Sequence, residues 1–314
     1  MSAGAAMRED RSAACRDAPG ALILTEPVRV AQLWRDGVAQ LRAAGIEHAQ
    51  REVTWLLEEA LGVSRLAIHA DGIESVGGHA AEQARRLFAR RAQHEPVQYL
   101  LGTQEFCGLT FEVTPAVLIP RPETELLVEE ALRVCGSQPS ARVVDVCTGS
   151  GCIAVAIARA RHDAMLWATD LSQQAVYVAR RNVSRNRVEA RVTVFQGDLL
   201  APLASAGLAG SVDVLVSNPP YIAAWEWPTM PPDVAEFEPR LALDGGPDGL
   251  RAHRQIADLA PRWLRPGGWL ILEIGQKQSV PLAEYIQASG AYGDVQVRQD
   301  FRGIDRVVSA QRKG

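Results

Sequence analysis

The segment Asn218-Pro219-Pro220-Tyr221 carries residue types that can hold a planar nitrogen for reaction. The lone pair of an amide or exocyclic amine nitrogen is delocalised, so the group must be gripped by its hydrogens and aimed. Asn218 offers a side-chain oxygen as acceptor, Pro219 a main-chain carbonyl at restricted φ, and Tyr221 a ring for stacking. The apolar run 212–217 places these groups at the end of a buried strand. The motif therefore predicts methylation of an NH2 group, although a proline-stiffened turn after a strand uses the same residues.

A second motif, residues 145–151, joins a strand-like run to a helical one and carries two glycines. Gly149 and Gly151 let the backbone approach a ligand where the N–H groups of a helix start are free. With Ala154 they also fit the G-x-G-x-x-A spacing of a dinucleotide site, and Asp170 follows at the distance of a ribose-binding acid. The glycine spacing alone leaves a dinucleotide and S-adenosylmethionine both open.

Three aspartates favour S-adenosylmethionine. Asp145 directly precedes the loop, where it would repel a pyrophosphate but could receive a cationic amino group. Asp170 could hold a ribose, and Asp198, after the next strand-like run, could meet an adenine amine. Three carboxylates around one ligand predict a cationic ligand without phosphate. Each acid could also be a strand-end cap, since Asp is common in such turns.

The composition fits a globular protein with one large and one smaller domain. The chain has 314 residues, of which 47% are hydrophobic and 22% charged. A net charge of −4 gives no general attraction to nucleic acid, so we expect no direct nucleic-acid target. No run approaches the roughly 18 apolar residues of a membrane helix, and the N-terminus lacks the apolar core of a secretory signal. We therefore expect a cytoplasmic protein.

Cysteine and histidine spacing predicts neither a disulfide framework nor a metal site. The five cysteines form no C-x-x-C pair, and their number is odd. Cys147 and Cys152 have no Cys or His partner at ligand spacing, so we interpret them as small apolar fillers. The six histidines are scattered along the chain without a metal-binding or nucleophile pattern.

The texture of the sequence predicts four segments. Residues 1–24 are polar and Ala-rich, typical of a flexible tail. Residues 25–95 repeat apolar side chains every three to four positions, which predicts a small helical domain. The arginines of its last helix indicate a solvated face or, alternatively, a contact with an acidic partner. Residues 96–120 alternate apolar and polar side chains as a hairpin linker does. In residues 121–314, strand-like and helical runs alternate, which predicts a parallel sheet with crossover helices.

Residues 121–125 begin this last segment with the sequence Arg-Pro-Glu-Thr-Glu. A proline in the first turn of a helix costs no hydrogen bond, because its missing N–H would have had no partner there. The two acids, Glu123 and Glu125, suit the positive end of the helix dipole. We therefore expect a helix to start at this motif.

These motifs together resemble the N5-glutamine methyltransferases of peptide chain release factors. The N-terminal helical region matches that family only in pattern. The specific matches occur in the family's order within residues 96–308, in the segments 96–102 (PVQYLLG), 119–125 (IPRPETE), 217–222 (SNPPYI), 238–250, 266–268 (PGG), 272–275 (LEIG) and 303–307 (GIDRV).

The resemblance implies an α/β fold, a Rossmann-like S-adenosylmethionine-dependent methyltransferase. A small N-terminal helical domain, joined by a β-hairpin, would help to hold the protein substrate. The implied reaction is methyl transfer to N5 of the glutamine in the Gly-Gly-Gln motif of a release factor. Asn218, Pro219 and Tyr221 are the implied catalytic residues. Pro220 and Arg121 would join them in binding the substrate.

The cofactor would contact Asn218 and the strand-end residues that surround the glycine loop. These are Asp145, Cys147, Thr148, Gly149, Ser150, Gly151, Asp170, Asp198 and Leu199. Two positions depart from the family pattern. Cys147 stands where glycine is usual, so its backbone must adopt a conformation that a side chain tolerates. Leu199 stands where an aromatic ring often covers the adenine, which predicts weaker stacking.

Four other functions share part of these features. An adenine-N6 nucleic-acid methyltransferase must also hold and aim an exocyclic NH2 group. However, the chain lacks a target-recognition segment and is net acidic. A nicotinamide-dependent oxidoreductase would use the glycine spacing and leave the proline motif idle. A sister branch methylates a glutamine of a ribosomal protein, whereas residues 121–125 look like the release-factor branch. A non-catalytic binding module would have no use for a clamp beside a cofactor loop.

Overall fold

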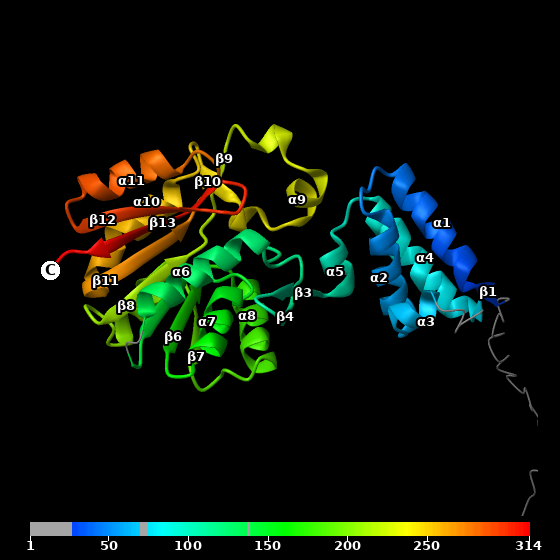
Figure 1. The fold of residues 1–314 in the computed structure, drawn as a ribbon, viewed down its shortest axis with the longest axis horizontal. Coiled ribbons are helices and arrows are strands. Elements are labelled where there is room, and N and C mark those ends of the chain that lie inside the picture. Colours follow the sequence, from blue (N-terminus) through cyan, green and yellow to red (C-terminus); the bar gives the residue numbers. More distant parts are fainter. Residues whose placement is uncertain (1–26, 70–74, 137–138) are drawn as a thin grey trace, which may run out of the picture.

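A computed structural model describes residues 27–69, 75–136 and 139–314, and it contains a helical bundle followed by an α/β domain (Figure 1). The expected tail at residues 1–24 lies outside the described residues. The bundle consists of α1 (Val30–Ala43), α2 (Ala49–Leu61), α3 (Arg65–His69) and α4 (Gly78–Ala92), with β1 (Val28–Arg29) paired antiparallel to β2 (Ser75–Val76). Its core is apolar, because side chains spaced by three or four positions face inward, among them Leu33, Leu41, Leu56, Leu57 and Phe88.

Two arginines at the end of α4 are paired within the protein. The Nε of Arg91 donates to Glu52 at 2.6 Å, in a buried ion pair that joins α4 to α2. Arg90 is more exposed and pairs with Glu95 at 2.6 Å. The expectation of a solvated face is therefore wrong for Arg91, because its charge is neutralised inside the bundle.

The predicted hairpin is present between the bundle and the α/β domain. Helix α5 (Val97–Leu101) leads into β3 (Thr103–Phe106), which pairs antiparallel with β4 (Leu109–Glu112). The buried side chain of Asn182 fixes this hairpin, because its Oδ1 accepts from the Glu112 N–H at 2.6 Å. Its Nδ2 donates to the main-chain oxygens of Glu112 and Ser150, each at 2.9 Å. One carboxamide thus connects the hairpin to the loop that precedes helix α7.

The large domain is built on a seven-stranded sheet in the order β12-β13-β11-β8-β5-β6-β7. Strands β7, β6, β5, β8 and β11 are parallel, as predicted, whereas β13 runs antiparallel to β11 and to β12. The sheet is therefore mixed, because the last two strands form a hairpin. The strands are β5 (Arg142–Val146), β6 (Met165–Asp170), β7 (Val192–Gln196), β8 (Val212–Ser217), β11 (Leu264–Glu273), β12 (Tyr292–Gln299) and β13 (Asp305–Arg312).

Helices cover both faces of this sheet (Figure 1). Successive strand residues point to opposite faces, so Val143 packs into one core and Val144 into the other. The first core holds α6 (Glu125–Cys135), α7 (Cys152–Ala160) and α8 (Gln173–Arg185). The second holds α10 (Arg251–Leu259) and α11 (Ser279–Ala288). Burial on both faces explains why the central strands β5 and β8 carry apolar side chains at consecutive positions, 143–144 and 214–216.

Residues 121–125 do not begin a regular α-helix at once. Pro122–Thr124 form a 3-10 turn, and α6 starts at Glu125. The Glu125 carboxylate also accepts a hydrogen bond from the Cys107 N–H at 2.7 Å. Its role is therefore wider than the predicted favourable contact with the helix dipole, because it also fixes the turn of the β3–β4 hairpin.

Shorter elements cover the carboxyl edge of the sheet. The longest of them, α9 (Pro232–Phe237), lies in an excursion of the chain between β8 and α10. The others are β9 (Ile222–Ala223), β10 (Asp244–Gly246) and the 3-10 turns Ala201–Ser205, Trp227–Thr229 and Arg240–Ala242. A further 3-10 turn, Ala260–Arg262, directly precedes β11 at the opposite edge of the sheet. None of the helices that the structure describes is both long and apolar enough to cross a membrane.

The register of the sheet brings three strand ends together. Val146 pairs with Ser217 of β8 on one side and with Thr169 of β6 on the other. The loops that follow β5, β6 and β8 therefore leave the sheet side by side. The chain also changes direction here, since β6 and β7 lie on one side of β5, and β8 and β11 on the other. Parallel sheets form their ligand crevice at such a switch point.

Candidate active site

A cavity of about 510 Å³ lies at this carboxyl edge. Small-molecule sites commonly have volumes of about 300–1,000 Å³, so the cavity can hold a nucleoside-sized ligand. Its wall comes from the loops after β5, β6, β7 and β8, from residues 116–124, and from residues 239–255. The predicted site residues that line it are Arg121, Cys147, Thr148, Gly149, Ser150, Asp170, Asp198, Leu199, Asn218 and Pro220.

Four predicted residues lie behind this lining. Pro219 is buried, Tyr221 is half-buried, and Asp145 is fully buried beneath the glycine loop. Gly151 caps α7 at φ 80°, where a Cβ atom would lie 3.2 Å from that of Ala179. Gly151 therefore permits close packing of α7 on α8, rather than contributing a surface to the cavity.

Asp145 supports the glycine loop from below. Its Oδ2 accepts hydrogen bonds from the Thr148 hydroxyl at 2.6 Å and from the Ala154 N–H at 3.2 Å. Its Oδ1 is buried and has no partner among the described residues. Burial raises the pKa of Asp145 to about 7, against the lowering effect of these two hydrogen bonds. An approaching cation would restore the ionised form.

Asp170 both lines the cavity and shapes the loop. Its Oδ2 accepts from the Gly149 N–H at 2.8 Å, and its Oδ1 accepts from the Ser172 N–H at 2.9 Å. Burial raises its pKa, and these two hydrogen bonds oppose the rise. Each carboxylate oxygen has a second lone pair, so Asp170 can still accept hydrogen bonds from ligand hydroxyl groups.

The two positions that depart from the family pattern share an unusual backbone. Cys147 has φ 59° and Leu199 has φ 46°, both in the left-handed region that favours glycine. The side chain at position 147 is therefore tolerated in a strained conformation. Burial raises the pKa of the Cys147 thiol above its ordinary value, which keeps it protonated and a weak nucleophile.

Asn218 presents an unsatisfied oxygen at the cavity wall. Its Nδ2 donates to the Thr124 hydroxyl oxygen at 3.3 Å. Its Oδ1 is buried and accepts no hydrogen bond from the described residues. A buried acceptor without a partner costs free energy, on the order of 1–3 kcal/mol, unless a ligand or water satisfies it. An N–H donor on a ligand would satisfy this oxygen.

Arg121 joins two segments of the cavity wall. Its guanidinium donates to Glu238, whose side chain is almost wholly buried, whereas that of Arg121 is 31% exposed. The other oxygen of Glu238 accepts from the Ile119 N–H at 3.3 Å. Burial raises the pKa of Glu238, and the charge of Arg121 opposes the rise. The pair fixes residues 119–121 against the end of α9, besides bringing a positive charge to the cavity.

Three residues without a predicted role also shape the site: Thr124, Glu238 and Gln278. Thr124 and Glu238 lie in segments that carry the family resemblance, which could have marked them as candidate site residues. The sequence spacing alone does not show which residues they contact. Gln278 lies in no motif. Its Nε2 donates to the main-chain oxygen of Tyr221 at 2.8 Å. Only the folded chain brings these residues to the strand ends.

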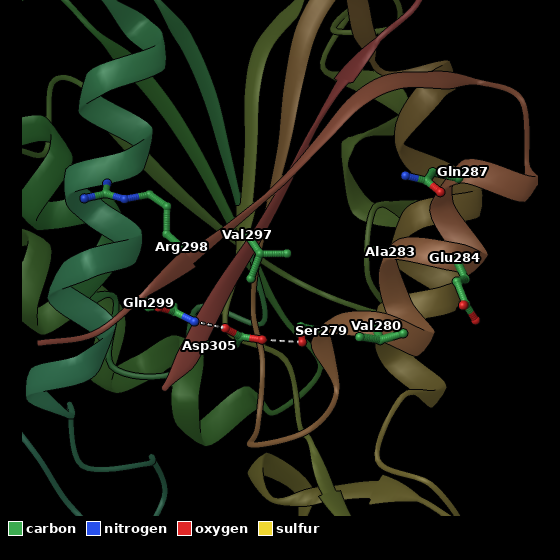
Figure 2. Close-up of a pocket in the computed structure, with 9 residues that line it drawn as sticks. All are labelled: Ser279, Val280, Ala283, Glu284, Gln287, Val297, Arg298, Gln299 and Asp305. Atoms are coloured by element: carbon green, nitrogen blue, oxygen red, sulfur yellow. Dashed lines mark hydrogen bonds between the residues drawn. The ribbon is translucent and has the colours of Figure 1, made fainter. Parts of the chain in front are cut away.

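A second groove, of about 570 Å³, lies between α11 and the β12–β13 pair (Figure 2). Asp305 is its central acid, and both carboxylate oxygens already accept hydrogen bonds. Ser279 donates to one at 2.5 Å and Gln299 to the other at 2.8 Å. None of the predicted site residues lines this groove. The predicted site residues that line a cavity therefore gather at the carboxyl edge, and this cavity is the candidate active site.

Comparison with known proteins identifies both parts of the chain. Residues 32–102 match the PrmC N-terminal domain, and residues 122–229 match the methyltransferase small domain. The catalytic domain of hMettl16, solved with the MAT2A 3'UTR hairpin 6, has a TM-score of 0.53 at 18% identity, covering 76% of this chain and 84% of its own. Together with the methyltransferase domain match, this likeness confirms the predicted Rossmann-like methyltransferase fold.

Similar sequences cover almost the whole chain. A release factor glutamine methyltransferase from Geobacter sulfurreducens is 45% identical over 278 residues, covering 88% of this chain and 94% of its own. The one from Moorella thermoacetica is 44% identical over 282 residues, covering 90% and 98%. A release factor-specific protein-(glutamine-N5) methyltransferase from Alicyclobacillus acidocaldarius has 35% identity and a TM-score of 0.41, covering 65% of this chain and 100% of its own. The chain belongs to the release factor glutamine methyltransferase family.

Proposed function

We propose that this protein transfers a methyl group from S-adenosylmethionine to the side-chain nitrogen N5 of a glutamine in peptide chain release factors. The glutamine is that of the Gly-Gly-Gln motif. The observation that carries the proposal is the buried Oδ1 of Asn218, which has no partner among the described residues and belongs to a residue that lines the cavity. A glutamine amide offers the N–H donor that this oxygen lacks.

The cavity suits the proposed cofactor. S-adenosylmethionine supplies, when bound, a methyl group on a positively charged sulfur. Asp170 can accept hydrogen bonds from its ribose, and Asp198 and Leu199 can contact its adenine. Residues 147–150 provide the remaining wall on that side, with the unpartnered Oδ1 of Asp145 beneath them. Buried carboxylates favour a cationic ligand over one with a pyrophosphate.

The clamp residues act by positioning. Asn218 Oδ1 and the main-chain oxygen of Pro219 would accept the two N–H bonds of the glutamine amide, so that its nitrogen faces the methyl group. Holding two reactants in a reactive geometry contributes a large part of such a rate enhancement. No strong base is required early, because the nitrogen becomes acidic only as the new bond forms. Its proton can then leave to Asn218, to the Pro219 oxygen or to water.

The substitution Asn218→Ala tests this proposal directly. It should retain S-adenosylmethionine binding, measured by calorimetry, and lose most turnover on a release factor, measured by mass spectrometry of the modified glutamine. Asn186→Ala, at the end of α8, is the matched control and should leave both unchanged. Near-normal turnover by the Asn218 variant would refute the proposed clamp.

The choice of substrate forms the second half of the proposal. We infer that the protein has no direct nucleic-acid target, which is supported by its net charge of −4. We also infer that it acts in the cytoplasm, which is supported by cysteine spacing that indicates no disulfide framework. Incubation with labelled S-adenosylmethionine and separate samples of release factor, ribosomal protein and DNA or RNA should label only the release factor. Substitution of its Gly-Gly-Gln glutamine should abolish the label. Label on nucleic acid or on a ribosomal protein would contradict the assignment.

A further inference from the structure

Thr124 lies directly against the Asn218 carboxamide. It ends the 3-10 turn before α6, is only 2% exposed and lines the active-site cavity. Its hydroxyl oxygen is 3.3 Å from Asn218 Nδ2 and accepts a hydrogen bond from it. The two residues come from distant parts of the sequence. Among the described residues, Thr124 is the hydrogen-bond partner of the Asn218 side chain.

The orientation of the Asn218 amide decides whether the clamp can work. A carboxamide has nearly the same shape after a half-turn that exchanges its oxygen and nitrogen. In one orientation Oδ1 is free to accept an N–H from a glutamine amide. In the other, the Asn218 NH2 would face the NH2 of the substrate, and two donors would oppose each other. The group that fixes this orientation therefore controls turnover.

Thr124 fixes the orientation seen in the structure, because its hydroxyl oxygen accepts from Asn218 Nδ2 at 3.3 Å. A hydroxyl has one hydrogen to donate and two lone pairs to accept. A hydrogen bond from the Thr124 side chain acts on the buried Glu273 carboxyl at the end of β11 and lowers its pKa. A donated hydrogen bond lowers the pKa of a carboxyl, so this effect agrees with the 3.3 Å contact in which a lone pair of Thr124 faces Asn218 Nδ2. The amide must then present Nδ2 to Thr124, and Oδ1 remains for the substrate.

We propose that Thr124 is a positioning residue that sets the orientation of the Asn218 carboxamide, so that Oδ1 faces the glutamine to be methylated. This inference rests on the proposed function of Asn218. Neither the composition of the motif at residues 121–125 nor its family resemblance assigns this role to the threonine. The role follows from the single contact between its hydroxyl and the clamp.

Two substitutions separate the hydroxyl from the shape of the side chain. Thr124→Val keeps the shape and removes the hydroxyl, and it should lower kcat about tenfold, the scale of one hydrogen bond. The Kd for S-adenosylmethionine should not change, because the cofactor-binding residues are intact. Thr124→Ser keeps the hydroxyl and should retain kcat within about twofold. A kcat of Thr124→Val equal to that of the wild type would overturn the inference.

A double-mutant cycle then tests whether Thr124 acts through Asn218. In an Asn218→Ala background, Thr124→Val should cause no further loss, because the group that it orients is gone. An equal loss in both backgrounds would overturn the inference while leaving the proposed function in place. If the valine variant does not fold, Thr124→Ala replaces it. Loss of S-adenosylmethionine binding by both Thr124→Val and Thr124→Ala would show a purely structural role and refute the inference. A wild-type protein that fails to methylate a release factor would instead refute the proposed function.

Discussion

Gln278 and Tyr221 are joined by a hydrogen bond of 2.8 Å, from the side-chain Nε2 of Gln278 to the main-chain oxygen of Tyr221. The same carboxamide accepts from the Gly275 N–H at 2.9 Å, so it ties the end of the clamp motif to the loop after β11. Gly249 packs against this bond. A Cβ atom at position 249 would lie 2.2 Å from Gln278 Nε2 and 2.3 Å from the Tyr221 oxygen.

Gly249→Ala should therefore displace Gln278 and the main chain at Tyr221, because the new Cβ atom cannot fit at these distances. We expect turnover to fall by more than about tenfold, which corresponds to an activation barrier raised by more than about 1.4 kcal/mol. Gly290→Ala is the matched control, because its φ of 71° is close to the 79° of Gly249 and a Cβ there meets nothing within 4 Å. The control should show only the backbone cost of about 1–2 kcal/mol, measured by denaturant unfolding, with normal turnover. Equal effects of the two substitutions on turnover would contradict the proposed packing.

The sequence predicts the parts of the site that follow from local rules. A buried strand that ends in polar residues places those residues at the edge of the sheet, and parallel strands end at the same edge. Asn218, Asp170 and the glycine loop were therefore predicted together, and all three line the same cavity. The direction of the last two strands shows the limit of this reasoning. The alternation of strands and helices predicts a parallel sheet, but it does not reveal that β13 pairs antiparallel with β11 while β12 forms the edge.

Contacts between distant segments could not be predicted in this way. Thr124 and Asn218 are separated by 94 positions, and their hydrogen bond depends on how α6 docks on the sheet. Gln278 reaches Tyr221 across 57 positions. No local pattern encodes such pairs, because the two partners lie in different segments of the sequence. Asp145 was predicted beside the ligand, but the packing of α7 buries it beneath the loop.

Cys147→Gly should stabilise the protein. The cysteine has φ 59°, a conformation that costs a residue with a side chain about 1–2 kcal/mol and that glycine adopts freely. Glycine loses more entropy on folding, so the expected net gain in the free energy of unfolding is about 1 kcal/mol. Denaturant unfolding measures it, with Cys152→Gly, in the first turn of α7, as a control that should destabilise. A less stable Cys147→Gly variant would show that the thiol contacts outweigh the backbone strain.

Arg121→Leu should destabilise the cavity wall more than its partial exposure suggests. The substitution leaves Glu238 buried without its ionic partner, and such an uncompensated carboxyl must take up a proton or stay charged at a cost. We expect a loss of about 2 kcal/mol in the free energy of unfolding at pH 8, discounted for the exposed guanidinium. Adding Glu238→Gln removes the charge and should recover part of the loss. A double variant less stable than Arg121→Leu alone would argue against this explanation.

Glu273 predicts a pH dependence of stability. Burial raises its pKa from an ordinary 4.5 to about 7, while the Thr124 side chain and the charge of Arg306 lower it. The folded state therefore holds the proton to a higher pH than the unfolded state does. Its contribution to stability is largest at acid pH and is lost as the pH rises from about 4.5 to about 7.

The substitution Glu273→Gln removes this titration while keeping an oxygen for Thr124. The variant should thus gain stability over the wild type as the pH rises from 5 to 8, by up to about 3 kcal/mol. His253, whose pKa burial lowers to about 4, titrates with the opposite sign but is present in both proteins, so it cancels in the difference. Urea unfolding of both proteins at several pH values measures that difference. A gap that stays constant or narrows with rising pH would mean that Glu273 is already ionised in the folded protein, with Arg306 and Arg121 outweighing its burial.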